Sequence, residues 1–227
     1  MNKFVRVLAV GLTVAVVGTS AAVAGAQTGG DLEAFCAARV EIEDAQTKKG
    51  NLVVLDKLVD AAPDEVRADI TKLRKQFAKK GYDAYEGSIV ARIDLFIYEN
   101  CPGNQVEFTA VDYEYVDAPA TLPAGPTNIK LTNDAPKENH EIGIVKLTPE
   151  GEGVDLLEIL SLPEKKQVPY FDFENATGAF APAGTSGYTL TNLEPGTYAY
   201  FCFLPVGGKK QGAPHFTEGM YGTFVVQ

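Results

Sequence analysis

Residues 196–227 read GTYAYFCFLPVGGKKQGAPHFTEGMYGTFVVQ, and this stretch decides the fold of the C-terminal half. Two apolar, aromatic-rich runs within it, 197–204 and 220–226, have the composition of neighbouring β-strands joined by one loop. Three side chains that bind soft metal ions lie on or beside that loop: Cys202, His215 and Met220. We therefore expect a thiol, an imidazole and a thioether to gather around a single connection.

The remaining candidate ligand is His140. It is the only other histidine of the chain, and it precedes an apolar, strand-like run at 141–147. Apart from Met1, Met220 is the only methionine. Two imidazoles and a thiolate with a weak axial thioether suit copper in both oxidation states and exchange one electron. The residue types therefore predict one copper ion with four ligands: His140, Cys202, His215 and Met220.

Around these ligands the sequence resembles the cupredoxins, the blue-copper family of plastocyanin and azurin. The segments that carry the resemblance are Asn133–Leu147 (NDAPKENHEIGIVKL), Pro195–Cys202 (PGTYAYFC) and Pro214–Val226 (PHFTEGMYGTFVV). In that family one histidine lies before an early strand, the cysteine ends the penultimate strand, and the second histidine and the methionine follow on the loop. The resemblance implies a Greek-key β-sandwich at 105–227 that transfers electrons and is not an enzyme.

The resemblance also implies a place for electrons to enter. His215, flanked by Pro214 and Phe216, is similar to the family's histidine at the solvent edge. We therefore expect His215 to lie at the surface and to pass electrons to and from a partner.

Two features depart from the family pattern. Twelve residues separate Cys202 from His215, where the family usually has only a few. A flexible loop about three times longer costs roughly 1 kcal/mol of closure entropy, but a loop with Gly207, Gly208 and Gly212 does not by itself fix His215. Glu141 stands where blue-copper proteins often place an asparagine that braces the cysteine loop. An acidic residue beside the ligand would favour the more positive, oxidised ion.

Two other functions use the same residues. The domain could be a metal-free binding or structural module, in which Cys202 and Met220 only fill the core, or a copper storage or delivery protein that prefers Cu(I). Zinc also binds His and Cys, but the thioether and the order of metal affinities favour copper. Two histidines are too few for the additional copper centres of a multicopper oxidase or a nitrite reductase.

Residues 1–26 have the pattern of a secretory leader. A basic start, with Lys3 and Arg6, is followed by an apolar stretch and by small residues that permit cleavage near Ala24 or Ala26. We expect the mature protein to be secreted. An uncleaved membrane anchor is the alternative, although glycine and hydroxyl residues dilute the apolar stretch.

The charge of the chain limits its partners. Its formal net charge is −10, and removal of the basic leader would make it more negative. Such a surface repels nucleic acids and anionic lipid, so we expect neither as a partner, whereas a basic redox protein would be attracted.

Residues 27–101 are expected to form a small helical bundle. Cys36 and Cys101 lie at its two ends, and three cysteines in an exported protein leave one unpaired after a single bridge. We predict a Cys36–Cys101 disulfide, with Cys202 as the odd thiol. No residue of this bundle suggests chemistry.

The helix boundaries follow from local signals. Asp31 is a candidate cap for a first helix that Gly50 would end, and a second run spans 52–59. A third helix follows Pro63, with one apolar face, and ends at Gly81. A fourth spans about 84–100. Beyond Pro102 the pattern becomes that of strands, with one short helix at 155–162 and a loop or edge strand at 171–180.

Overall fold

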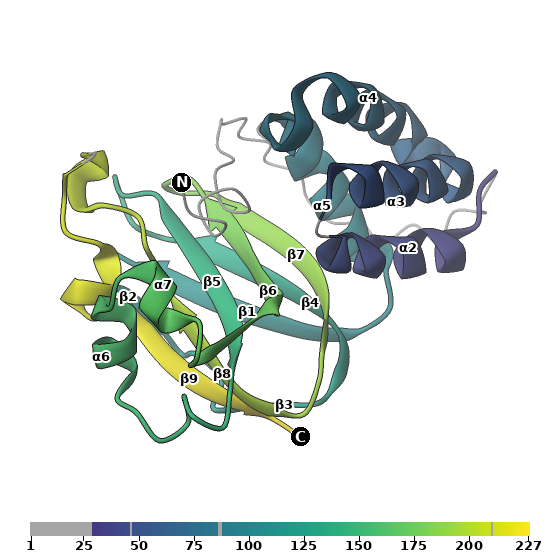
Figure 1. Ribbon diagram of the computed structural model, residues 1–227. Helices are drawn as coiled ribbons and strands as arrows, with labels where there is room; N and C mark the ends of the chain where they lie inside the picture. Colours follow the sequence, from purple (N-terminus) through teal and green to yellow (C-terminus); the bar gives the residue numbers. More distant parts are fainter. Residues whose placement is uncertain (1–28, 46, 86–87, 210) are drawn as a thin grey trace.

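The computed structural model describes residues 29–45, 47–85, 88–209 and 211–227. The predicted leader, 1–26, lies outside these residues. A bundle of helices stands against one side of a two-sheet β-sandwich, which confirms the predicted architecture (Figure 1). No helix among the described residues is long and apolar enough to cross a membrane.

Within the described residues, the bundle contains four α-helices and a short 3-10 helix. Their bounds are α2 (Leu32–Asp44), α3 (Lys48–Ala61), α4 (Asp64–Lys80), η1 (Gly81–Tyr85) and α5 (Ser88–Asn100). The Asp31 carboxylate accepts the Ala34 N–H and caps α2 as predicted. The apolar face predicted for α4 is buried in the bundle core: Val66, Ile70, Leu73 and Phe77.

Gly50 does not end the first helix, which corrects the sequence prediction. Helix α2 already ends at Asp44, and Gly50 lies in the first turn of α3. The Thr47 hydroxyl accepts the Gly50 N–H at 3.0 Å and caps α3. A threonine cap stabilises a helix start by about 1 kcal/mol, which offsets the roughly 1 kcal/mol that a helical glycine costs.

The predicted disulfide is present. Cys36, on α2, is bonded to Cys101, which directly follows α5. Both cysteines are buried in the bundle core. The bridge joins the first and last helices of the bundle and leaves Cys202 as a buried free thiol, as predicted.

Two sheets form the sandwich. The first has the order β2-β1-β4-β7 and the second β3-β9-β8-β5-β6. Their bounds are β1 (Asn104–Val111), β2 (Glu114–Val116), β3 (Thr121–Leu122), β4 (Gly125–Asn133), β5 (His140–Leu147), β6 (Phe171–Ala181), β7 (Ser186–Leu193), β8 (Gly196–Phe201) and β9 (Tyr221–Val226). The pairs β1/β4 and β3/β9 are parallel and the other pairs are antiparallel. The segment 171–180, predicted as a loop or an edge strand, is the edge strand β6.

Alternating apolar side chains from both sheets fill the space between them. On β1 the residues Val106, Phe108 and Ala110 point into this core, as their period of two predicts. Tyr198 of β8 and Phe224 of β9 stack across the second sheet with ring centroids 5.4 Å apart. Burying each large side chain of this kind contributes about 1.5–3 kcal/mol, so the core holds the two sheets in a fixed relation.

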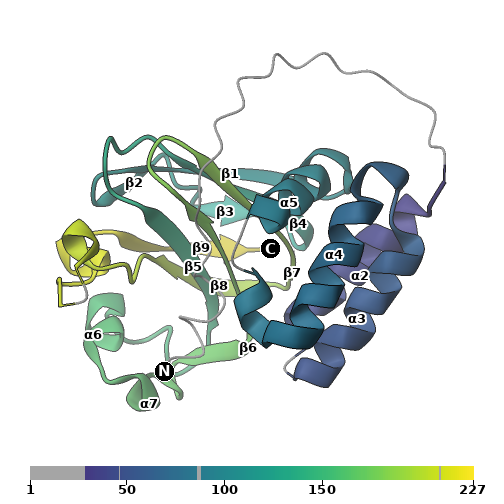
Figure 2. The same ribbon diagram turned by 90° about the horizontal axis from the view of Figure 1, so that it is seen from above.

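Helices cover both outer faces of the sandwich, as the view from above shows (Figure 2). The bundle packs on the first sheet, where Leu190 of β7 joins the bundle core and Tyr98 of α5 lies 4.9 Å from Tyr188. On the other side, α6 (Leu156–Ser161) and α7 (Glu164–Gln167) lie near the second sheet, and α6 covers Val145 and Phe201. The Asp155 carboxylate caps α6.

Candidate metal centre

The candidate ligands come together at one end of the second sheet. His140 is the first residue of β5, Cys202 directly follows β8, and these neighbouring strands run antiparallel. Met220 directly precedes β9, which pairs with β8 on the other side. The Cys202 N–H donates to the Met220 carbonyl at 3.1 Å, so the thiol and thioether residues are opposite each other. Sheet register alone therefore gathers three of the four.

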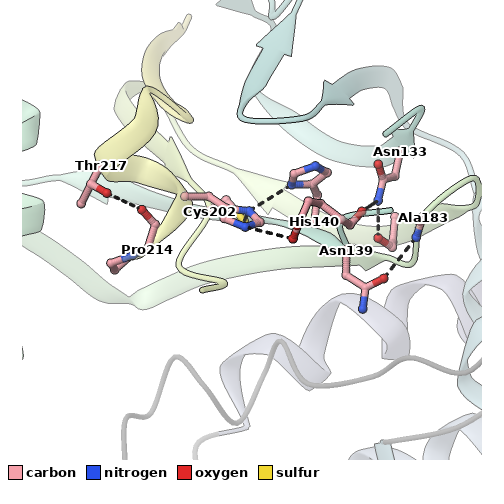
Figure 3. A network of polar contacts seen from close by, with 10 residues as sticks. Asn133, Asn139, His140, Ala183, Cys202, Pro214 and Thr217 are labelled. Atoms are coloured by element: carbon pink, nitrogen blue, oxygen red, sulfur yellow. Dashed lines mark hydrogen bonds and ion pairs between the residues drawn. The ribbon is translucent and has the colours of Figure 1, made fainter. Parts of the chain in front are cut away.

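Three donor atoms converge in the interior, and Figure 3 labels two of the residues that carry them, His140 and Cys202. The Cys202 Sγ lies 3.4 Å from the His215 Nδ1, which in turn lies 3.2 Å from the His140 Nδ1. All three donor atoms lie within 4.8 Å of one another, and all three residues are 0% exposed. Over the described parts of the chain, no other group of three such side chains has this arrangement.

The spacing fits one metal ion. Donors at about 2.0–2.3 Å from a single ion, the range for imidazole nitrogen and thiolate sulfur, are separated from each other by about 3.3–3.8 Å. The observed 3.2 and 3.4 Å are close to this range. Without an ion, the two facing Nδ1 atoms can share only one proton between them, because a second N–H would point at the first. A cation satisfies both lone pairs and the thiolate together.

The described residues between Cys202 and His215, 203–209 and 211–214, approach each other at the base of a long loop. Two backbone hydrogen bonds cross its base, from the His215 N–H to the Leu204 carbonyl at 2.9 Å and from Val206 N–H to the Ala213 carbonyl at 2.9 Å. The Phe216 N–H also donates to the Cys202 carbonyl at 3.0 Å. These three bonds fix the position of His215 although the loop is long.

A second loop positions His140. The buried Asn133 amide, at the end of β4, donates to the carbonyls of Glu138 and Ala181, each at 2.9 Å. The Asn139 side chain accepts the Ala183 N–H at 3.2 Å (Figure 3). These bonds join the segment before His140 to the end of β6 and fix the point at which β5 begins.

Glu141 takes a bracing role. Its buried carboxylate accepts the Phe203 N–H at 3.0 Å and so ties β5 to the segment that follows Cys202. The Tyr115 hydroxyl donates to the Glu141 carbonyl from the opposite sheet. Burial raises the pKa of the Glu141 carboxyl to about 7, and the Phe203 N–H partly opposes that shift. The acid stands in the position where the family resemblance leads us to expect an asparagine.

Burial controls the protonation of the donors. It lowers the pKa of His140 to about 4, with the neighbouring His215 adding to the shift. Burial also lowers the pKa of His215, against the opposing effects of the Glu138 charge and the Pro205 carbonyl. The pKa of the Cys202 thiol is raised by burial and then by the Glu141 charge. The three metal-free donor groups are therefore neutral, with both imidazoles free to act as ligands.

His215 is not at the solvent edge, which corrects the expectation from the resemblance. It is 0% exposed. The ring of Tyr113, from the turn between β1 and β2, meets the His215 ring edge-on at a centroid distance of 4.9 Å. The Glu138 carboxylate lies 3.7 Å from the His215 Nε2, too far for a hydrogen bond. Both His140 Nε2 and His215 Nε2 are buried without a hydrogen-bond partner.

Met220 is fully buried in the core between the sheets, in the same cluster as Cys202. Its N–H donates to the His215 carbonyl at 3.3 Å, so its backbone supports the turn that carries His215. The thioether as a fourth ligand stays a prediction.

Sequence reasoning missed three residues around the site: Tyr113, Asn133 and Glu138. Asn133 and Glu138 lie in the segment before His140 that carries part of the family resemblance. Neither residue type by itself indicates that it supports a ligand. Tyr113 lies about 100 positions from His215 in the chain, and no local pattern connects them.

The comparisons with known proteins concern the sandwich. No family model and no curated protein matches the sequence. Solved structures similar to the chain include auracyanin B (24% identity over 56% of this chain and 90% of that chain, TM-score 0.39). A second is the dithionite-reduced auracyanin of Roseiflexus castenholzii, with 22% identity over 55% of this chain and 98% of that chain and a TM-score of 0.37. A third is rusticyanin of Thiobacillus ferrooxidans, with 20% identity over 56% of this chain and 79% of that chain and a TM-score of 0.33.

Proposed function

We propose that this chain binds one copper ion through His140, Cys202 and His215, with Met220 as a weak fourth ligand, and that it carries single electrons. It is a carrier and not an enzyme. The observation that carries the proposal is the convergence of three buried donor atoms within 4.8 Å of one another. Two nitrogens and one sulfur in this arrangement are the donor set of an electron-transferring copper site.

The surrounding contacts support electron transfer because they hold the donors still. His140 and Cys202 lie at ends of paired strands, and backbone hydrogen bonds at the base of the loop fix His215. Bonds from Asn133 and to Glu141 add further restraint on either side of His140. A site that keeps one geometry in both oxidation states loses little energy to rearrangement, and this makes one-electron exchange fast.

Each donor has a distinct role. Cys202 would bind as a thiolate, since a metal cation lowers the pKa that burial raises. The imidazoles would bind through the two Nδ1 atoms that face each other, which leaves the proton of each ring on Nε2. Copper would supply the change between Cu(I) and Cu(II).

Titration of the metal-free protein with Cu(II) tests this proposal. We expect one equivalent to bind with an intense visible absorption that ascorbate bleaches and oxygen or ferricyanide restores. Cys202→Ser should abolish this absorption while Cys36 and Cys101 remain paired. A mixture without colour and without bound metal would favour a metal-free module. Tight binding of Cu(I) without reversible oxidation would favour storage or delivery.

We also propose the wider setting that the sequence predicts. The division into a leader at 1–26, a bundle at 27–101 and a sandwich at 105–227 describes a secreted carrier. The Cys36–Cys101 disulfide supports an oxidising compartment. Mass spectrometry of the protein secreted by its host, with an N-terminus at or near residue 25 or 27, tests the cleavage.

A further inference from the structure

One end of the helical bundle carries exposed lysines that the proposed copper site does not use. The second half of α4, residues 70–80, holds five basic residues and no acidic one, whereas residues 64–69 hold three acids. Helices α3 and α4 lie side by side (Figure 2), and the Lys48 Nζ at the start of α3 donates to the Ala78 carbonyl near the end of α4 at 3.0 Å. We call the exposed lysines of these two segments the lysine cluster: Lys48, Lys49, Lys72, Lys75, Lys79 and Lys80.

The arginines of the bundle and the lysine cluster differ in their partners. Ion pairs join Arg67 to Asp64, Arg74 to Asp56 and Arg92 to Asp69. Within the described residues, no member of the lysine cluster forms an ion pair. Lys72 acts on the Asp69 charge only from a distance, because Arg92 holds that carboxylate with two hydrogen bonds. The charges of the cluster therefore remain available to a partner.

Helix stability does not explain the whole cluster. Lys79 and Lys80 lie in the last turn of α4, where the helix dipole favours positive charge. The bond to the Ala78 carbonyl accounts for Lys48. Lys49, however, lies in the first turn of α3, where the same dipole disfavours a cation and where no acid is present. Like charges gathered at one end also repel one another, so the cluster points to a negatively charged partner.

The surroundings of the cluster limit which anion fits. In α3 and α4 only Val53 is a large apolar side chain that is exposed, which is too little to insert into a membrane. Tyr82 and Tyr85 pack against Phe77, with ring centroids 5.5 and 5.2 Å away, so they offer no platform for the bases of a nucleic acid. Lysine is a flexible point charge without the planar fork with which arginine grips one phosphate. These features favour a flexible chain of repeated phosphates without bases.

We propose that the lysine cluster binds a linear polymer of polyol phosphates, of the kind of poly(glycerol phosphate), and holds the protein at a surface that carries such a polymer. Lys72, Lys75 and Lys79 share one face of α4 and follow each other at about 4.5 and 6 Å along the helix axis. A flexible phosphodiester chain can therefore contact several of them at once.

The net charge of −10 does not prevent this contact. At physiological salt a charge is screened over about 8 Å, so the acids of the sandwich act only weakly on a polymer bound to the bundle. The cluster lies on α3 and α4, whereas the candidate ligands lie on the sandwich. Binding of the polymer therefore needs neither copper nor the copper site.

Calorimetric titration of the metal-free protein with poly(glycerol phosphate) tests the proposal. We expect saturable binding at low salt. The logarithm of the binding constant should fall as the logarithm of the salt concentration rises, with a slope of about −0.7 for each lysine that contacts a single phosphodiester chain. Absence of binding at low salt, or binding that salt does not weaken, would overturn the proposal.

Lys49→Gln/Lys75→Gln removes two charges that helix stability does not require. This variant should bind about three- to tenfold more weakly, with a salt slope smaller by about 1.4. Its urea midpoint should not fall, because glutamine and lysine have similar helix propensities and a cation leaves the wrong end of α3. Lys165→Gln/Lys166→Gln is the matched control: it makes the same charge change on exposed positions of α7 and should bind like the unsubstituted protein. Equal weakening in both variants would overturn the cluster in favour of net charge alone.

Two further titrations separate the polymer from other anions. Single-stranded DNA and vesicles that contain anionic lipid are compared with poly(glycerol phosphate) at the same salt concentration. We expect poly(glycerol phosphate) to bind at least about threefold more tightly than either, and copper loading to leave its affinity unchanged. Tighter binding of DNA would indicate a nucleic-acid site and tighter binding of vesicles a membrane contact, and either result would overturn the proposal.

Discussion

The Glu141 carboxylate accepts a hydrogen bond from the Phe203 N–H, 3.0 Å away. This bond joins the residue after the first histidine to the residue after the cysteine, so it spans the candidate metal site. A carboxylic acid at this position can carry a charge, whereas an amide cannot. Burial raises the pKa of the Glu141 carboxyl to about 7. The first prediction follows from this contact.

Glu141→Ala should destabilise the metal-free protein by about 1–3 kcal/mol, because it removes the acceptor of the partly buried Phe203 N–H. Glu141→Gln keeps an acceptor oxygen in the same place and should cost less. Urea unfolding at pH 5 measures both values, because the raised pKa keeps the Glu141 carboxyl protonated in the folded protein there and no buried charge opposes folding. Equal losses for the two variants would mean that the hydrogen bond does not stabilise this end of the sandwich.

Glu138 should influence the metal through His215. Its carboxylate lies 3.7 Å from the His215 Nε2, and a negative charge there favours the oxidised, more positive ion. Glu138→Gln should therefore raise the reduction potential of the copper-loaded protein, as measured by voltammetry. Glu150→Gln, an exposed change in the turn after β5, is the control and should leave the potential unaltered. A lower potential in Glu138→Gln would contradict this reading.

Gly143 of β5 is paired with Phe201 of β8, and the Phe201 ring leaves no room for a side chain at position 143. A Cβ added there would lie 2.7 Å from the Phe201 ring, and Phe201 is fully buried. Gly143→Ala should cost about 1–3 kcal/mol of unfolding free energy, since the ring cannot move without disturbing the packed face. Gly153→Ala is the control, because an added Cβ there meets nothing within 4 Å. The two variants are compared by urea denaturation. Similar midpoints would show that the sheet accommodates a Cβ at position 143 without loss of stability.

The disulfide should act on the bundle without altering the metal site. Its cysteines are 65 residues apart, and closing a loop of that length stabilises a folded chain by about 4 kcal/mol in the chain-entropy model. Cys36→Ser/Cys101→Ser should lower the unfolding free energy by about 2–5 kcal/mol while the copper absorption is retained. Loss of the absorption in a folded double variant would show that the bundle supports the site.

The convergence of His140, Cys202 and His215 could be predicted because candidate ligands are recognised by residue type. With two histidines and one methionine beyond Met1, few sets of ligands are available, and strand ends place His140 and Cys202 together. The disulfide could be predicted for a similar reason, because the chain has only three cysteines. Alternating apolar residues, such as Val106 and Phe108, indicate the sandwich.

Longer-range features escape such reasoning. The loop between Cys202 and His215 is held at its base by backbone hydrogen bonds, which glycine-rich sequence does not reveal. His215 contacts the ring of Tyr113, which lies in a turn of the opposite sheet. Gly50 was predicted to end a helix because glycine often does so. Instead, the Thr47 cap begins a new helix that contains Gly50.

X-ray absorption spectroscopy of the copper-loaded protein at the copper edge, repeated on Cys202→Ser and His215→Ala, tests the central claim most directly. We predict one short sulfur contact and two imidazole contacts in the unsubstituted protein. The sulfur contact should vanish in Cys202→Ser, and one imidazole contact should vanish in His215→Ala. Copper held by oxygen donors, or a sulfur contact that survives in Cys202→Ser, would contradict the account.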